Sequence, residues 1–391
     1  MSKQSVFYSP VRIVSGVGES LKLGHWMDVY NAKKMLIITG GHVAKTEAFG
    51  NILMSLDEAG AAYKLFTECI PEPPMEIVDD LADKMRAGDI DMVAAVGGGS
   101  VLDTAKAVCM LKNNPGRIKE YLFGGGRTPQ FPSVPLLCVP TTAGSGSEVS
   151  CASVIEDTDR HIKLSCTHPN LYPAAAILDP LMQAGMPQMV AAGTGMDALT
   201  HAIESFTSKN ASAFSDMCAR MAIKLIGANL PVVVSDPYNL ESRMNMSQAS
   251  SMAAMAMANG GLGAVHGISQ AMGGVAHTPH GITNAILLPK VMGYNYIGNP
   301  EKFAEIAELL GADVSGMCVE EAAAKSVDVV CELNHRIGIP DYVDSLGVTS
   351  DMFGDIVEGT MGYRLLWMNP VEFTENMAYE ILSECMLGER S

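Results

Sequence analysis

The sequence predicts an α/β N-terminal domain with a parallel, Rossmann-like sheet, followed by an all-helical C-terminal domain. Two observations favour this fold class. In the first half of the 391 residues, short and nearly continuous apolar runs alternate with amphipathic stretches, a pattern typical of a parallel sheet covered by helices on both faces. Beyond about residue 185 the strand signals fade, and long Ala-, Met- and Leu-rich segments follow. We therefore expect one domain at 1–184 and a second, all-helical domain at 185–391.

The strands of the N-terminal domain are predicted from short apolar runs that end at glycine or proline. The run "KKMLIITGG" is the first of them, and the segment after it has helical spacing and ends at glycine. The run "MVAAVGGGS" repeats this order of strand and helix. The predicted strands are 33–41, 92–100, 134–142 and 174–180, and the predicted helices are 42–60 and 101–114.

The helices of the C-terminal domain are predicted from long segments with few strand signals. Two breaks between them, "LPVVVSDPYN" and "YIGNPE", contain proline, which removes a helical hydrogen bond and usually ends a helix. The predicted helices are 187–208, 211–230, 241–258, 301–311 and 317–337.

Charge and composition exclude several classes of partner. The formal net charge is −17 at pH 7, which argues against nucleic acid, because phosphate backbones bind Lys- and Arg-rich surfaces. We see no signal-peptide pattern and no apolar run long enough to span a membrane. The nine cysteines are scattered and form no CxxC pair, as expected in a reducing compartment. We therefore expect a cytoplasmic protein that binds neither nucleic acid nor a membrane.

A glycine-rich turn in "AAVGGGSVLDTAKAV" joins a predicted strand to a predicted helix. Gly98 and Gly99 let the backbone approach a ligand closely, and Ser100 adds a hydroxyl. The free N–H groups and the positive dipole end of the helix would bind a pyrophosphate. The alternative is a tight turn without a ligand, because the spaced G-x-G-x-x-G fingerprint is absent.

A second loop, "PTTAGSGSEVS" at 140–150, follows another predicted strand. It supplies hydroxyl groups from Thr141, Thr142, Ser145 and Ser147. Two such loops at the carboxyl ends of parallel strands favour one elongated ligand in the crevice there. A dinucleotide has that shape.

Three of the nine histidines lie in the apolar, glycine-rich stretch "LGAVHGISQAMGGVAHTPHG" at 262–281. One such histidine would be a packed core residue, but three together suggest a bound ion. Asp197 and His201 are four residues apart and share one face of a helix; alone, such a pair is usually a surface hydrogen bond. With His266 and His280 they would form a site of one carboxylate and three imidazoles, which suits Fe(II), Zn(II) or a similar ion. A divalent cation also offsets the cost of burying a carboxylate.

Several segments together resemble the iron-containing (group III) alcohol dehydrogenase family, across roughly residues 5–385. They are "GGGSVLDTAK", "PTTAGSGSEV", "DPLM", "GMDALTHAIES", "GLGAVHG" and "TPHGITNAILLPKVMGYN". The resemblance implies four metal ligands: Asp197, His201, His266 and His280. It implies cofactor contacts at Gly98, Gly99, Ser100, Thr141, Thr142 and Lys163. Asp103 and Lys106 belong to the same motif, and we interpret them as structural residues.

The chain departs from this family near the substrate. Many members carry a second histidine four residues after the one at 266, close to the nicotinamide and the substrate, and this chain has Gln270 there. Glutamine forms hydrogen bonds but carries no proton at neutral pH. His277 is the alternative proton carrier, so Gln270 and His277 are the catalytic candidates. Cys151 and Met257 are candidates for the substrate pocket, with packing residues as the alternative.

A further departure concerns the choice of cofactor. The turn after the first predicted strand often has an acidic residue that holds the adenosine ribose, and here it reads Thr39-Gly40-Gly41. A carboxylate would repel a 2′-phosphate and glycine does not. NADP(H) therefore stays open beside NAD(H), and His42 or Lys45 would favour it.

The resemblance implies a metal-dependent, NAD(P)-linked oxidoreductase that interconverts a short primary alcohol and its aldehyde. The metal would act as a Lewis acid on the substrate oxygen, and hydride would pass to or from the nicotinamide. The family also implies a homodimer or larger homo-oligomer. The alternatives are a dehydroquinate-synthase-like enzyme, a glycerol-dehydrogenase-like enzyme, and a non-enzymatic nucleotide-binding protein.

Overall fold

The computed structural model describes residues 5–158 and 162–387. These residues form two compact units. The α/β unit comprises 9–142 and 146–184, and the helical unit comprises 5–8, 143–145 and 185–387. The predicted fold class is confirmed, because the first unit holds a parallel sheet with flanking helices and 185–387 contains helices and no strand.

The sheet of the α/β unit has six strands in the order β1-β8-β5-β4-β2-β3, all parallel. Its four central strands confirm the four predicted from apolar runs. The two edge strands, β1 and β3, were not predicted because each is mostly exposed or half-buried and lacks a continuous apolar run. The strands are β1 (Arg12–Ser15), β2 (Met35–Gly40), β3 (Tyr63–Cys69), β4 (Met92–Gly97), β5 (Leu136–Pro140) and β8 (Ala175–Leu178).

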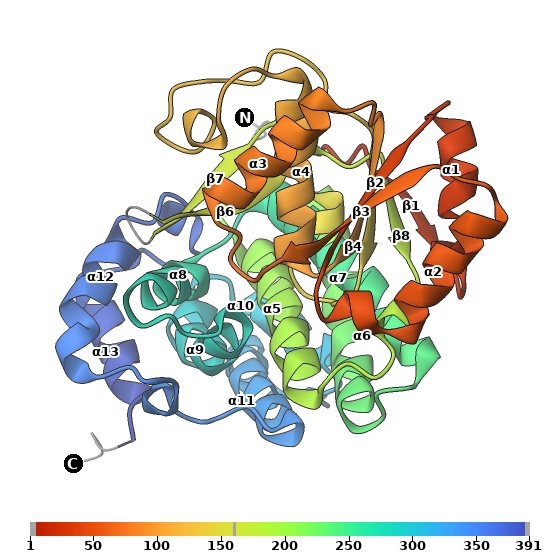
Figure 1. Cartoon of the computed structure of the whole chain (residues 1–391). Helices are drawn as coiled ribbons and strands as arrows, with labels where there is room; N and C mark the ends of the chain where they lie inside the picture. The colour runs from red at the N-terminus through yellow and green to blue at the C-terminus, as the bar shows by residue number, and fades with distance from the viewer. Residues whose placement is uncertain (1–4, 159–161, 388–391) are drawn as a thin grey trace. The chain divides into compact units, whose positions relative to one another are not determined.

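Helices cover both faces of this sheet, as Figure 1 shows. Side chains alternate along each strand, so Leu36 and Ile38 pack with α3 and α4, while Met35 and Ile37 pack with α1 and α2. A separate antiparallel hairpin of β6 (Ala152–Asp157) and β7 (Ile162–Thr167) completes the unit. The helices are α1 (Leu23–Val29), α2 (Glu47–Glu58), α3 (Met75–Ala87) and α4 (Gly99–Asn113).

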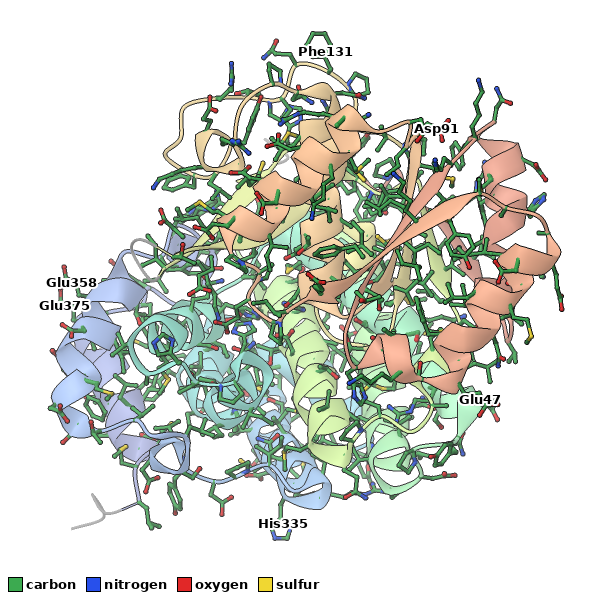
Figure 2. The ribbon with its side chains drawn as sticks, in the orientation of Figure 1. Glu47, Asp91, Phe131, His335, Glu358 and Glu375 are labelled. Carbon is green, nitrogen blue, oxygen red and sulfur yellow. The ribbon has the colours of Figure 1, made fainter. Side chains whose placement is uncertain are left out.

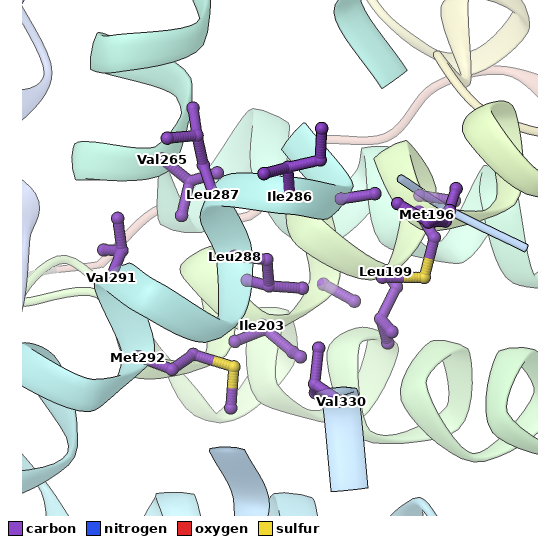
Figure 3. Close-up of a cluster of buried hydrophobic side chains, with 14 of the residues drawn as sticks. Met196, Leu199, Ile203, Val265, Ile286, Leu287, Leu288, Val291, Met292 and Val330 are labelled. Atoms are coloured by element: carbon purple, nitrogen blue, oxygen red, sulfur yellow. The ribbon is translucent and has the colours of Figure 1, made fainter. Parts of the chain in front are cut away.

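The helical unit is built around one apolar core, part of which is drawn in Figure 3. Met196, Leu199 and Ile203 of α5 meet Leu288 and Met292 of α9 there. The five helices predicted in this region are confirmed as α5, α6, α7, α10 and α11. The unit's helices are α5 (Gln188–Thr207), α6 (Ala213–Ser235), α7 (Leu240–Gly260), α8 (Ala264–Ala276), α9 (His280–Asn295), α10 (Pro300–Leu309), α11 (Val319–Ile337), α12 (Phe353–Met361) and α13 (Glu375–Glu384).

Helix α6 does not end where the sequence predicted. We expected a break at "LPVVVSDPYN", but α6 continues through the buried Pro231 to Ser235. Proline removes one helical hydrogen bond and crowds the preceding turn. Here α6 is packed against α5 and α7, and Leu230, Pro231 and Val233 are all buried. The packing of this segment therefore outweighs the local preference for a break.

Helix α6 also departs from the expectation that no segment is long and apolar enough to span a membrane. By length and composition alone, α6 is apolar enough to do so, and just over half of its most apolar window is buried. A core helix passes the same test, so this is weak evidence for a membrane. Some charged side chains are exposed, such as Glu47 on α2 and Glu358 on α12, which point away from the ribbon in Figure 2.

Candidate metal and cofactor sites

Helix α5 presents three polar side chains on one face within an otherwise apolar helix. Asp197, His201 and Glu204 follow each other at intervals of four and three residues, so they share that face. All three are buried. The opposite side of the helix supplies core residues such as Met196 and Leu199. Buried polar groups of this kind need partners, and α8 and α9 provide them.

Helices α8 and α9 bring the remaining two predicted ligands to α5. His266 lies in the first turn of α8, and His280 is the first residue of α9. Glycines allow the close approach of α5 and α9. A Cβ atom at Gly281 would overlap the carbonyl group of Gly193. The backbones therefore touch one turn before Asp197, and His280 reaches the carboxylate.

Three imidazoles surround a single carboxylate oxygen. The Nε2 atoms of His201, His266 and His280 lie 3.7, 3.6 and 3.5 Å from Oδ1 of Asp197. The ligand atoms of Asp197, His201 and His266 all lie within 4.8 Å of one another. Two ligand atoms that each lie about 2.1 Å from one ion are separated by about 3.0–3.6 Å, depending on the coordination geometry. The separations in this cluster are close to that range, so the four residues fit a divalent cation.

The electrostatics of the cluster keep its carboxylate charged. Burial raises the pKa of Asp197, but His201, His280 and His266 outweigh it and hold that pKa well below its usual range. Burial lowers the pKa of His266, but Glu204 and Asp197 together raise it to about 9. Burial is the main reason that the pKa of His201 is lowered. The carboxylate thus stays ionised in an apolar surrounding, because the adjacent imidazoles offset the cost of its burial.

Three further polar side chains touch this cluster and were not predicted. Each contacts a predicted ligand at hydrogen-bond distance. The contacts are Glu204 Oε2 to His266 Nδ1 at 2.6 Å, Asn284 Nδ2 to Asp197 Oδ1 at 2.8 Å, and Ser269 Oγ to His280 Nδ1 at 3.1 Å.

The helical repeat is the signal that would have found these three residues. Each lies three or four positions from a predicted ligand, on the same helix face. The pairs are His201 with Glu204, His266 with Ser269, and His280 with Asn284. The spacing gives candidates only, because the helix partner that a side chain meets depends on tertiary packing.

The glycine turn and the start of the second predicted cofactor loop, at Thr141 and Thr142, lie side by side in the α/β unit. Strand β4 ends at Gly97, Gly98 caps the next helix, and α4 begins at Gly99. A Cβ atom at Gly98 would lie 3.3 Å from Oγ1 of Thr142. The backbone N–H of Thr141 donates to the carbonyl of Gly97 at 3.0 Å. Only small residues fit this turn, and the first N–H groups of α4 lack helical acceptors, as a phosphate site requires.

A buried lysine joins the second loop to α4. Lys106 is fully buried, and its Nζ donates to Ser147 Oγ at 2.6 Å, to Ser150 Oγ at 3.1 Å and to the carbonyl of Ala152 at 2.9 Å. Ser147 in turn donates to Asp103 Oδ1 at 2.5 Å. This network agrees with a structural role for Asp103 and Lys106. The Ser147 hydroxyl is engaged within the protein, so its contact with a cofactor stays a prediction.

Of the other predicted cofactor residues, Gly40 lies at the carboxyl end of β2, and Lys163 pairs with a residue just beyond the carboxyl end of β3. Gly40 ends β2, and a Cβ atom there would lie 3.1 Å from the carbonyl oxygen of Cys69, the last residue of β3. Lys163 on β7 forms a 2.6 Å ion pair with Glu72, which follows β3. The backbone N–H of Glu72 donates to Ser100 Oγ at 3.3 Å. Lys163 and Ser100 are thus linked through Glu72, which was not predicted.

Comparison with known proteins decides the family. A model of the family "Iron-containing alcohol dehydrogenase" matches residues 10–180, and a model of the C-terminal part of the "Fe-containing alcohol dehydrogenase family" matches 191–386. The chain belongs to the iron-containing alcohol dehydrogenase family. This confirms the resemblance inferred from the motifs. It favours that family over the dehydroquinate-synthase-like and non-enzymatic alternatives.

Individual members of the iron-containing alcohol dehydrogenase family are similar over nearly the whole chain. A 1,3-propanediol dehydrogenase of Klebsiella pneumoniae is 37 % identical over 93 % of this chain and 92 % of its own length. An NAD-dependent methanol dehydrogenase of Bacillus methanolicus is 36 % identical over 88 % and 90 %. The crystal structure of a 1,3-propanediol oxidoreductase has a TM-score of 0.94 at 34 % identity and covers 98 % of this chain and 100 % of its own.

Four predicted residues of this iron-containing alcohol dehydrogenase are the candidates for catalysis and for the substrate pocket. Gln270 is exposed on α8, and His277 is exposed at the end of that helix with a positive φ of 52°. Cys151 belongs to the α/β unit and Met257 to the helical unit, and both are half-buried. Their proposed catalytic and substrate-pocket roles therefore stay predictions.

Proposed function

We propose that the chain is a metal-dependent, NAD(P)-linked oxidoreductase that interconverts a short primary alcohol and its aldehyde. The observation that carries this function is the convergence of three imidazoles on one carboxylate oxygen, at 3.5–3.7 Å, in a family of iron-containing alcohol dehydrogenases. Asp197, His201, His266 and His280 would hold the metal, which supplies Lewis-acid polarisation of the substrate oxygen when bound.

The chain's own residues contribute position and charge. The glycine turn before α4 and the adjacent threonines, Thr141 and Thr142, would bind the pyrophosphate of the cofactor. The Asp197 carboxylate supplies negative charge for the cation. The side chains of Asp197, His201 and His266 are at most 10 % exposed, and electrostatic interactions are stronger where water is excluded. Gln270 and His277 are the proposed residues for hydrogen bonding and proton movement near the substrate.

The choice of metal and cofactor follows from the same residues. One carboxylate and three imidazoles suit Fe(II) or Zn(II), and the family's description as iron-containing supports Fe(II). The similarity to an NAD-dependent methanol dehydrogenase supports NAD(H) as the cofactor. Gly40 carries no carboxylate that would repel a 2′-phosphate, so NADP(H) is the second candidate.

The substrate is proposed from the named relatives, which act on short alcohols: methanol and 1,3-propanediol. A panel of short aldehydes, each assayed with NADH and NADPH after addition of Fe(II) or Zn(II) to metal-stripped protein, tests the function. We expect turnover of at least one C1–C4 aldehyde, with net oxidation of the cofactor. A metal-loaded, folded protein that oxidises neither cofactor with any member of the panel would contradict the proposal. So would a reaction without net consumption of the cofactor.

We also propose that the enzyme works in the cytoplasm as a homodimer or larger assembly. All nine cysteines are free, which supports a reducing compartment. Three exposed apolar side chains, Phe214, Met217 and Met221, lie along one face of α6, which supports a subunit interface. Light scattering on the purified protein measures the assembly size. A monomer at micromolar concentration would contradict the proposed homodimer or larger assembly.

A further inference from the structure

Glu204 makes two contacts with the helix that carries His266. Its side chain is 5 % exposed. One carboxylate oxygen, Oε2, lies 2.6 Å from Nδ1 of His266. The other, Oε1, accepts a hydrogen bond from the backbone N–H of Val265 at 2.7 Å. Both oxygens of one buried carboxylate therefore bind consecutive residues of α8.

The contact with the backbone N–H of Val265 caps α8 from a distant part of the chain. The residue before the helix is Gly263, which has no side chain to accept the free N–H groups of the first turn. Glu204 accepts from Val265, and Asn369 Oδ1 accepts from the N–H of Ala264 at 3.2 Å. A Cβ atom at Gly263 would lie 2.8 Å from Asn369 Oδ1 and 3.0 Å from Glu204 Oε1. The glycine leaves room for both caps, and a negative charge is favourable at this end of a helix.

The contact with Nδ1 of His266 decides how the imidazole of that residue faces the metal cluster. A ring nitrogen that faces a carboxylate oxygen at hydrogen-bond distance carries the proton. Nδ1 of His266 therefore bears the hydrogen. In the neutral ring, which is the form that binds a metal, Nε2 faces Asp197 at 3.6 Å and directs its lone pair toward the position of the ion. A carboxylate behind a histidine ligand fixes both the tautomer and the ring orientation.

We propose that Glu204 is a positioning residue that makes His266 competent to bind the metal and, through the same carboxylate, attaches the start of α8 to α5. The inference rests on the proposed metal site. It assigns to this chain a fifth residue on which the metal affinity depends.

Glutamine at this position separates the two contacts. Its side chain has nearly the same volume but only one acceptor oxygen. If that oxygen accepts from Val265, the amide NH₂ faces Nδ1 of His266 and places the ring proton on Nε2. If the amide is reversed, its oxygen accepts from Nδ1 of His266, but its NH₂ group then faces the backbone N–H of Val265, so that two buried donors face each other. Only a carboxylate can accept at both places, so Glu204→Gln keeps the cap only with the wrong tautomer of His266.

The test is the affinity of the metal-stripped protein for Zn(II), measured by competition with a chromophoric chelator, beside the thermal unfolding midpoint of the same metal-free protein. We expect Glu204→Gln to weaken Zn(II) binding by about 10–100-fold, the range found when an outer partner of a metal-bound histidine is lost. Glu204→Ala should weaken it at least as much. Asn369→Ala is the matched control, because it removes the other cap of α8 and leaves His266 with its carboxylate.

For Asn369→Ala we expect a lower unfolding midpoint and a wild-type Kd for Zn(II). For Glu204→Gln we expect a midpoint no lower than that of Asn369→Ala. A wild-type Kd in Glu204→Gln would overturn the inference. An equal loss of affinity in Asn369→Ala would also overturn it, because Glu204 would then act only through the stability of α8. If Asp197→Ala binds Zn(II) as tightly as the wild type, the proposed metal site itself is wrong, which is a separate result.

Discussion

At the scale of single residues, the four clustered ligands differ in how far they contribute to folding. The side chain of His280 is 40 % exposed, whereas that of His266 is 2 % exposed. Replacing His280 therefore removes little packing, and replacing His266 leaves a buried gap beside Glu204. His280 is the ligand at which the effect on activity separates best from the effect on stability.

We expect His280→Ala to lower aldehyde-dependent NADH oxidation by more than about 100-fold, because even the loss of an outer partner of a ligand costs about 10–100-fold. The unfolding midpoint of the metal-free protein should change little. His266→Ala should lose activity and also unfold at a lower temperature. Activity assays and circular dichroism measure the two effects, and a His280→Ala variant with most of the wild-type activity would refute the assignment.

The preference for NAD(H) or NADP(H) is also expected to depend on a single residue, Gly40. We expect Gly40→Asp to raise the KM for NADPH more than the KM for NADH, because a carboxylate repels the 2′-phosphate. Any side chain at this position crowds the carbonyl of Cys69, so Gly40→Ala is the control for that steric effect. Steady-state kinetics with both cofactors measures the ratio. Equal changes with NADH and NADPH would show that Gly40 does not face the ribose.

The sequence predicted residues within one helix better than contacts between helices. Asp197 and His201 were predicted together because four positions make nearly one helical turn. Asn369 could not be predicted, since it caps a helix whose first residue lies 105 positions earlier in the chain. Ser147 was predicted for its hydroxyl, but the structure joins that hydroxyl to Lys106 and Asp103. Such pairings depend on the fold and leave no periodic signal.

At the scale of elements, the close crossing of α5 and α9 brings His280 of α9 next to Asp197 of α5. We expect Gly281→Ala to force these helices apart, since its Cβ would overlap the backbone of Gly193. Overpacking of this kind costs about 1–3 kcal/mol, and His280 would move away from Asp197. Thermal unfolding and Zn(II) affinity of the metal-free protein should both fall.

Gly293→Ala is the control for that substitution. Gly293 lies on the same helix, and nothing is within 4 Å of a Cβ atom built there. We expect this variant to bind Zn(II) normally and to gain roughly 0.5–1 kcal/mol of stability, as glycine is a poor helix former. If Gly281→Ala also binds Zn(II) normally, the close approach of α5 and α9 is not needed for the site.

Elements were predictable where burial was complete. The central strands β2, β4 and β5 are buried along almost their whole length and appear as continuous apolar runs. The edge strands and the hairpin of β6 and β7 are partly exposed and gave no such run. Helices α8 and α9 were missed because their glycines lower helix propensity, although those glycines allow close packing. The predicted break between α6 and α7 is present, but it begins only after Ser235, because the buried Pro231 lies within a packed helix.

At the scale of the whole molecule, the chain has apolar cores in two units, and the metal cluster belongs to one of them. The four proposed ligands come from α5, α8 and α9 of the helical unit, so a bound cation would link three helices of one core. Because an ion that binds only the folded state stabilises it by mass action, we expect saturating Zn(II) to raise the unfolding temperature. The gain is about 4 kcal/mol at 1,000 times the Kd.

Scanning calorimetry with and without Zn(II) measures this shift. Asp197→Asn is the control, because it keeps the side-chain volume and removes the charge. The variant should show a much smaller shift than the wild type. Equal shifts in the two proteins would mean that Zn(II) stabilises the chain from another position.

The central claim is that one divalent cation, held by Asp197, His201, His266 and His280, is needed for aldehyde reduction. The most direct measurement is an anaerobic titration of metal-stripped protein with Fe(II), in which aldehyde-dependent oxidation of NADH is followed at each addition. Activity should begin near zero, rise in proportion to the added ion and level off at one ion per chain. Full activity before any metal is added, in protein shown by elemental analysis to be metal-free, would contradict the account.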